Sequence, residues 1–269
     1  NNLLIEQSGG HGIFIENNGA TDLTVSVQQS SITSTGHAFS AVAVSGGDLT
    51  VAIANSTANS TAGKGFMVDG SAGTGTTFVS QFQDNTVVAA GDGGVIFTDV
   101  IFDAVSGGAP DPVSFSSLLV GSATARVTGN GVSFTDTVGD VDMGNVDIFN
   151  ATGAGLFASN SPTLILRSQA GSTIDTSAGP ALNLSDAETA LFFDSVDSED
   201  SPTRAAEFHT VKGALSVTTT VMDDADDPPF RYEDIPNPFT VSFGNTTINS
   251  LQGDLITDNQ VRVGDETGL

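Results

Sequence analysis

The chain of 269 residues contains no cysteine, no tryptophan and a single tyrosine, and it has only 7 lysine and arginine residues. The absence of cysteine excludes disulfide bonds and thiolate zinc sites, so a continuous core must stabilise the fold. The basic residues are set against 32 acidic ones, which gives a net charge of −25. Because binding to phosphate or to anionic lipid requires clustered lysine and arginine, we expect no nucleic acid partner and no anionic membrane partner.

Long apolar runs and helical patterns are also missing. No stretch approaches the roughly 20 apolar residues that a membrane-spanning helix needs, and no window carries a helical apolar stripe. The chain begins without methionine, and no charged-then-apolar leader opens it. We therefore expect a segment of a longer protein. A large charge of one sign keeps an extracellular protein dispersed, which favours a secreted or cell-surface location.

Glycine is abundant, at 31 residues, and serine, threonine, asparagine, valine and alanine fill much of the rest. This composition favours strands joined by tight corners. A motif of glycine, any residue, a small residue and a short apolar strand recurs at intervals of 26, 27, 28, 38, 24 and 26 residues. The longest interval indicates an insertion at 103–114. The seven copies begin at Gly10, Gly36, Gly63, Gly91, Gly129, Gly153 and Gly179.

A second apolar strand follows each copy, and a third short strand such as SSIT completes a coil. The predicted second strands include LTVSVQ from Leu23, LTVAIA from Leu49, TFVSQF from Thr77 and VDMGNV from Val141. A unit of this size cannot bury its own apolar face, so successive coils stack and pair equivalent strands in parallel. The pattern predicts an all-β, right-handed parallel β-helix, a solenoid of about ten coils that occupies 1–269 as a single domain. Alternation places Ile13 and Ile15 on one face and Phe14 on the other.

The stretch GIFIENNGATDLTVSVQQSSIT, residues 12–33, resembles the coil consensus GIxIxNxxxxxLTVxxxxIT of the pectin-lyase-like superfamily. The resemblance extends over nearly the whole chain and implies a scaffold. That scaffold serves polysaccharide lyases, glycosidases, phage tailspikes and autotransporter or adhesin passengers, so it does not choose among these functions.

Gly10-His11-Gly12 is the triplet found around a catalytic histidine in polygalacturonase-like enzymes of this superfamily. In those enzymes it follows aspartate motifs and precedes Arg-x-Lys, and this chain has neither arrangement. The sequence Gly36-His37-Ala38 repeats the pattern one coil later, as a structural position does. We therefore interpret His11 as a corner residue.

Four acids lie in the sequence FTDTVGDVDMGNVD. Paired carboxylates catalyse glycoside hydrolysis, and neighbouring coils are able to place acids on one face. Asp140 and Asp142, however, fall at a turn and a strand edge, where solvated aspartate is ordinary. We favour that structural interpretation for all four acids, which are Asp136, Asp140, Asp142 and Asp147.

The segment 222–238 interrupts the coil pattern with six acids, four prolines and the only tyrosine. Its aspartates offer oxygen ligands for Ca²⁺, but no known calcium-loop spacing supports a site. We interpret it as an excursion loop stiffened by proline. Because loops on a rigid scaffold often carry function, 222–238 and 103–114 are the best recognition candidates. The aspartates in question are Asp223, Asp224, Asp226 and Asp227.

No convergent catalytic, metal or cofactor set emerges from the residues, and neither end of the chain carries an amphipathic cap. Uncapped solenoid ends invite end-to-end assembly. We therefore expect a non-enzymatic structural or adhesive β-solenoid: a stalk, an adhesin passenger or a fibre subunit. Its expected partners are further copies of itself, or a glycan or protein on a host or other surface. The alternative is a carbohydrate-active enzyme or a glycan-binding tailspike.

Overall fold

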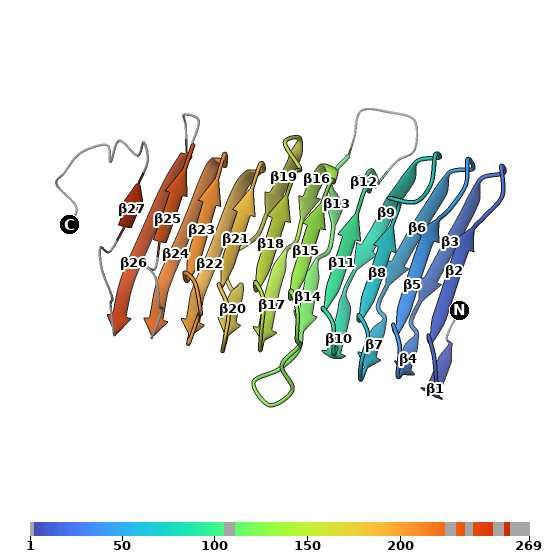
Figure 1. The fold of residues 1–269 in the computed structure, drawn as a ribbon, viewed down its shortest axis with the longest axis horizontal. Helices are drawn as coiled ribbons and strands as arrows, with labels where there is room; N and C mark the ends of the chain where they lie inside the picture. Colours follow the sequence, from blue (N-terminus) through green and yellow to red (C-terminus); the bar gives the residue numbers. More distant parts are fainter. Residues whose placement is uncertain (1–2, 105–110, 224–229, 235–238, 250–255, 259–269) are drawn as a thin grey trace.

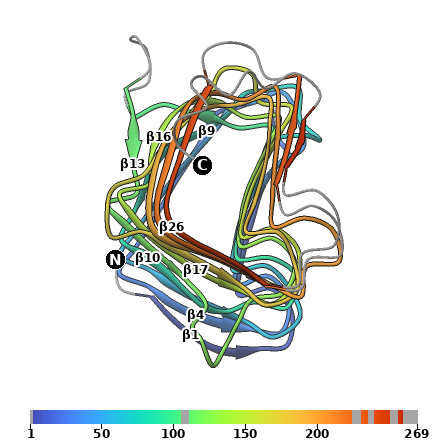
Figure 2. The same cartoon turned by 90° about the vertical axis from the view of Figure 1, so that its left-hand side faces the viewer.

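The protein is described here by a computed structural model that covers residues 3–104, 111–223, 230–234, 239–249 and 256–258. All regular elements in these residues are β-strands, and the strands stack in chain order along one axis (Figure 1). Viewed along that axis, each coil has three sides (Figure 2). The fold is a parallel β-solenoid of about nine turns, close to the ten coils expected from the repeats.

The first side of the solenoid is a sheet of ten parallel strands. The first seven strands each follow one copy of the glycine motif, and the last three continue the same sheet towards the C-terminus. These strands are β2 (Ile13–Asn17), β5 (Phe39–Ala43), β8 (Phe66–Asp69), β11 (Val95–Thr98), β15 (Val132–Thr135), β18 (Leu156–Ser159), β21 (Leu182–Ser185), β23 (Ala206–His209), β25 (Phe230–Glu233) and β27 (Ile256–Asp258).

The second side follows the first in every coil. It contains β3 (Leu23–Gln28), β6 (Leu49–Ala54), β9 (Thr77–Gln83), β12 (Ile101–Phe102), β13 (Val113–Ser114), β16 (Val138–Asp142) and β19 (Leu164–Arg167). The third side contains β1 (Leu4–Ser8), β4 (Ser31–Ser34), β7 (Thr57–Ser60), β10 (Asn85–Ala89), β14 (Ser117–Val120), β17 (Asn145–Asn150) and β20 (Thr173–Thr176). Towards the C-terminus, longer strands run across both sides: β22 (Glu188–Glu199), β24 (Lys212–Asp223) and β26 (Phe239–Asn249).

The register of the first side confirms the alignment of the repeats in six of the seven copies; in the fourth, the strand begins at Val95, four residues after Gly91 instead of three. Ile13 pairs with Phe39, which pairs with Phe66, and the same position continues to Leu182 and Ala206. Alternation along the strands is also as predicted, because the inward residues of β2 pack on the core while Phe14 is 51% exposed. One predicted strand is wrong. The sequence VDMGNV, from Val141, does not form one strand, because β16 ends at Asp142 and β17 begins at Asn145.

Single residues in the left-handed conformation turn the chain at two of the corners. Those between the first and second sides include Asp99, Asp136 and Asn160, with φ near +50°. Asparagine and aspartate tolerate this conformation because their short side chains bond nearby backbone groups. Within the described ranges, eight of the eleven non-glycine residues with positive φ are of these two types, and six of the eight are aspartates. These six acids therefore serve the corners.

A steric constraint explains why the repeat motif has a small residue before each strand of the first side. A Cβ atom at Gly65 would lie 2.6 Å from the carbonyl oxygen of Gly94 and 2.7 Å from Cγ1 of Val87. The chain thus passes close to the next coil and to the third side at this point, just before each strand of the first side begins. The same position holds Ala38 in the preceding coil and Gly94 in the following one. In these three coils the position holds only glycine or alanine, and at Gly65 the surroundings leave no room for a Cβ atom.

Phenylalanine fills the widest part of the core. Five rings pack against one another with centroid separations of 4.8–6.4 Å, mostly edge-on or tilted, which is the favourable geometry for aromatic pairs. They lie in the coil that contains the longest repeat interval and in its neighbours. The cluster comprises Phe82, Phe97, Phe102, Phe115 and Phe134, all of them fully buried.

The insertion in the longest interval differs from the prediction. It is divided between two places: the chain leaves the second side after β12 and returns at β13, and it leaves again between β14 and β15. The second excursion, 121–131, projects below β14 in Figure 1. It is anchored by Arg126, whose guanidinium bonds the carboxylate of Asp175 at 2.8 Å and the backbone oxygen of Asn150 at 3.2 Å. The interval length alone does not reveal this division.

Neither of the two expected excursions lies wholly outside the sheets. Val113 and Ser114, at the end of 103–114, pair with β16 as β13. Likewise β25, within 222–238, is a regular strand of the first side, with Phe230 and Tyr232 buried. Alternating apolar residues in FRYE make this strand fit the core, despite the prolines on both sides of it.

Candidate binding site on the second side

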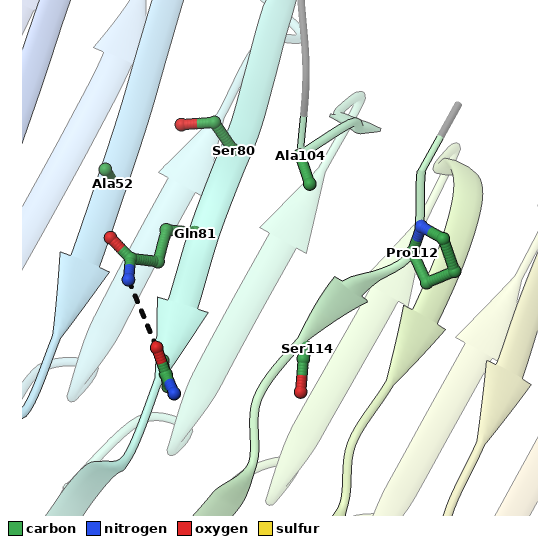
Figure 3. A pocket seen from close by; sticks show the side chains of 7 residues that line it. Ala52, Ser80, Gln81, Ala104, Pro112 and Ser114 are labelled. Atoms are coloured by element: carbon green, nitrogen blue, oxygen red, sulfur yellow. Dashed lines mark hydrogen bonds between the residues drawn. The ribbon is translucent and has the colours of Figure 1, made fainter. Parts of the chain in front are cut away.

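A shallow hollow with a volume of about 450 Å³ lies on the second side, where the insertion leaves the sheet (Figure 3). Two local features form it. Strand β9 contains a bulge, since Val51 pairs with Val79 but Ala52 pairs with Gln81. Strand β12 ends after two residues, and β13 takes over its place beside β16. The lining residues are Ala52, Ser80, Gln81, Gln83, Ala104, Pro112 and Ser114.

The lining residues that the structure describes are uncharged and rich in hydrogen-bonding groups. The amide of Gln81 donates to the side-chain oxygen of Gln83 at 3.2 Å, and Gln83 donates to the hydroxyl of Ser116 at 3.0 Å. A glutamine side chain has two donor hydrogens and one acceptor oxygen. Each of these two amides uses one donor hydrogen in these bonds and keeps the other available for a ligand. Ala52 and Pro112 add apolar surface. Such a surface suits an uncharged ligand with several hydroxyl groups.

These residues were not singled out from the sequence. Gln81 and Gln83 belong to TFVSQFQ, which was recognised only as a second strand. A signal is present, because Ser80 and Gln81 break the alternation of apolar and polar residues before Phe82 restores it. The hollow nevertheless adjoins 103–114, which the sequence did indicate as a recognition candidate. Residues 105–110 of that insertion lie outside the described residues.

His11 lies at a corner, as predicted. Its Nδ1 accepts a hydrogen bond from the backbone N–H of His37 at 3.2 Å, one coil later. His37 repeats the arrangement, with its Nδ1 accepting from the N–H of Lys64 at 2.9 Å. The two imidazole centroids are 4.8 Å apart. Both side chains thus take over an acceptor role that a backbone carbonyl fills elsewhere in a strand ladder.

The four predicted acids do not converge. Asp136 is a left-handed corner residue whose carboxylate accepts from the amide of Asn160. Asp147 lies on the third side and accepts from the hydroxyl of Thr173 at 2.6 Å. Asp140 and Asp142 alone share a strand face, on β16.

The two acids of β16 are both engaged in local contacts. Asp140 forms an ion pair with Arg167 at 2.9 Å, and this contact raises the pKa of the arginine. Asp142 accepts from the backbone N–H of Gly144 at 3.0 Å, which fixes the corner before β17. Neither acid lines the hollow.

The proposed calcium ligands are placed only in part. Asp223 ends β24, while Asp224, Asp226 and Asp227 lie outside the described residues. In the part of the chain that the structure covers, no three histidine, aspartate or glutamate side chains are grouped as a metal site requires. Tyr232 is buried against Phe208, with centroids 5.3 Å apart, and burial raises the pKa of its hydroxyl.

The described residues include no helix that is long and apolar enough to cross a membrane. In comparisons with known proteins, no family matches this chain, and neither the curated proteins nor the solved structures contain a significant match.

Proposed function

We propose that this chain is a non-enzymatic β-solenoid of the pectin-lyase-like type, serving a secreted or cell-surface protein as a stalk, adhesin passenger or fibre subunit. The observation that carries the proposal is the apolar edge of the first coil. Ile13 and Ile15 point towards the core but are only partly buried, whereas their equivalents Phe39 and Ala41 in the next coil are fully buried. Leu4 is 64% exposed at the same end.

The backbone of this coil is equally available. Among the described strands, β1 pairs only with β4, β2 only with β5 and β3 only with β6. An open strand edge binds further strands. The named strands that the structure describes all pair in parallel, so a further coil from a second copy continues the same ladder. Such a head-to-tail contact does not close on itself and generates fibres. We therefore propose that a further coil stacks on this edge, either from the same protein or from a second copy, and that isolated copies of this chain associate end to end.

Electron microscopy and sedimentation at increasing protein concentration test this proposal. We expect assemblies that lengthen with concentration. Ile15→Lys, which adds a charge to the edge, should abolish them. Ile96→Lys, on the outward face of β11 in the middle of the rod, should leave them unchanged. Single short rods at every concentration, or equal assembly of both variants, would overturn the proposal.

The hollow on the second side favours a second candidate function, which is binding of a neutral glycan by a tailspike or an adhesin. Its amides and hydroxyls match the hydroxyl groups of sugars, and its apolar wall from Ala52 and Pro112 suits a ring face. The strong negative charge of the chain disfavours acidic glycans.

A glycan array with neutral and acidic sugars tests this second candidate. Binding of a neutral glycan that Gln81→Ala removes would support it. Gln28→Ala, at an exposed position of β3 in another coil, is the matched control. If no glycan binds, or if both variants bind equally, the hollow has no such role.

A further inference from the structure

Two histidines in ring contact form the corner between the third and first sides in the first two coils. The imidazoles of His11 and His37 lie 4.8 Å apart with an angle of 38° between their planes, and Phe14 stacks on His11 at 5.4 Å. Each Nδ1 accepts a backbone N–H from the following coil, at 3.2 Å from His37 and 2.9 Å from Lys64. The rings therefore link three successive coils.

This arrangement requires neutral imidazoles. A ring nitrogen accepts a hydrogen bond only through its lone pair, so the single proton of each ring resides on Nε2. Addition of a proton at Nδ1 converts the acceptor into a donor that faces another donor. The backbone N–H then loses its partner.

The same corner position is occupied elsewhere by a residue that does not titrate. Asn130, which like His37 lies two residues before the first position of its strand, accepts the backbone N–H of Ala154 through its side-chain oxygen at 3.0 Å. The corner thus needs an acceptor and does not need an imidazole. Histidine adds only a dependence on pH.

The charges around the histidine pair oppose protonation on balance. His37 faces the imidazole of His11 and the ammonium group of Lys64, and it faces one acid, Asp92, which Lys64 binds at 2.7 Å. Partial burial lowers the pKa of His37 below its ordinary value of 6.5, Lys64 and His11 lower it further, and Asp92 acts in the opposite direction. A second proton at this corner would place two cationic rings in contact.

We propose that the His11–His37 corner is an acid-sensitive latch that holds the first coils together at neutral pH and releases them when the His37 ring takes up a proton. The direction follows from linkage. The unfolded state binds the proton more tightly than the folded state, so the stabilisation is complete above pH 6.5 and is lost as the pH falls from there to the lower pKa of the folded state. A corner at which asparagine supplies the acceptor, as Asn130 does, lacks this dependence on pH.

Two NMR measurements on the full chain test the latch. Nitrogen shifts of the imidazoles at pH 7.5 should show the proton on Nε2 in both rings. Protection of the Lys64 amide from hydrogen exchange, relative to the unfolded chain, should fall about fivefold or more between pH 7.5 and pH 5, the change expected when its hydrogen bond to the His37 ring is lost. The amide of Ala154, at the asparagine corner, is the internal reference and should keep its protection.

The double variant His11→Asn and His37→Asn provides the matched control, because it copies the Asn130 corner. It should remain folded and keep equal protection at both pH values. Protons on Nδ1 at neutral pH, or a loss of protection in wild type that matches the loss at Ala154, would overturn the proposal. Equal sensitivity to acid in the double variant and in wild type would also overturn the proposal.

Discussion

Arg167 on β19 donates to Asp140 on β16 through both Nε and Nη2, each at 2.9 Å. The pair joins adjacent coils across the second side, and the arginine side chain is 44% exposed. Bidentate contacts of this kind fix the orientation of a carboxylate. Asp140, one of the four acids for which the sequence analysis weighed a catalytic role and favoured a structural one, therefore contributes to the stacking of coils.

Replacement of Asp140 by asparagine tests this role. We expect a loss of about 0.2–1 kcal/mol in the free energy of unfolding, since exposed ion pairs contribute that much. Urea denaturation of Asp140→Asn, Arg167→Gln and the double variant measures the coupling. Asp147→Asn, which removes a carboxylate without an ion pair, is the control. Loss of a measurable glycosidase activity in Asp140→Asn with the fold intact would instead favour a catalytic acid.

The inward and outward positions of β19 allow a sharp test of the core. Leu164 is fully buried, whereas the next residue, Ile165, faces outward in register with Asp140 and Glu188. Leu164→Lys buries an unpaired charge and should unfold the neighbouring coils. Ile165→Lys places the same charge between two acids and should be neutral or stabilising. Circular dichroism melts of the two variants measure the difference, and equal melting would show that the assigned faces are wrong.

The small position before each strand of the first side yields a third prediction. Gly65→Ala brings a methyl group within 2.7 Å of Val87 and closer still to the Gly94 carbonyl, so we expect a loss of about 1–3 kcal/mol from overpacking. Gly10→Ala, at the first position of the motif, meets nothing within 4 Å and should change stability by less than about 0.5 kcal/mol. Denaturant unfolding distinguishes them. Equal tolerance of both changes would contradict the steric explanation.

The sequence was sufficient to predict the fold because a solenoid repeats one local solution. The glycine motif, the small residue and the apolar strand recur wherever a coil must turn and pass close to its neighbour. The register from Ile13 to Phe66 and from Val132 to Leu182 therefore follows from alignment of the copies alone, whereas the copy at Gly91 is displaced by one residue because its strand begins at Val95. The corner role of His11 followed in the same way, from His37 one coil later.

Features that occur once were harder to predict. The hollow depends on a bulge at Ser80 and Gln81 and on the break between β12 and β13, and neither belongs to the repeat. The excursion that carries Arg126 was hidden because an interval between repeats gives the total number of extra residues and not their division. The strand FRYE was missed because the surrounding prolines and acids outweighed its alternation.

Asp197 on β22 provides a prediction with a defined pH dependence. It lies in register with Asp175 of the preceding coil, and one of its carboxylate oxygens is buried without a hydrogen-bond partner among the described residues. Desolvation raises the pKa of Asp197 above its ordinary value of 3.8, the charges of Asp175 and Asp223 raise it further, and bonds from Ser195 and Val221 oppose the rise. The folded state thus binds this proton more tightly than the unfolded state. The charged carboxylate destabilises the fold above the raised pKa, and the penalty is absent below 3.8.

Asp197→Asn should therefore stabilise the protein at pH 7 by up to about 1 kcal/mol, the scale of cross-strand charge pairs. The amide of the new asparagine is able to donate a hydrogen bond to Asp175. Asn160 donates in the same way to Asp136, which lies in the coil before it. The gain should vanish below pH 3.8, where the wild-type acid is also neutral. Asp175→Asn is the matched contrast and should destabilise the protein, because it removes the ion pair with Arg126 at 2.8 Å. Urea unfolding at pH 7 and pH 3.5 measures both variants; a loss of stability in Asp197→Asn at pH 7 would show that the carboxylate is held by favourable contacts.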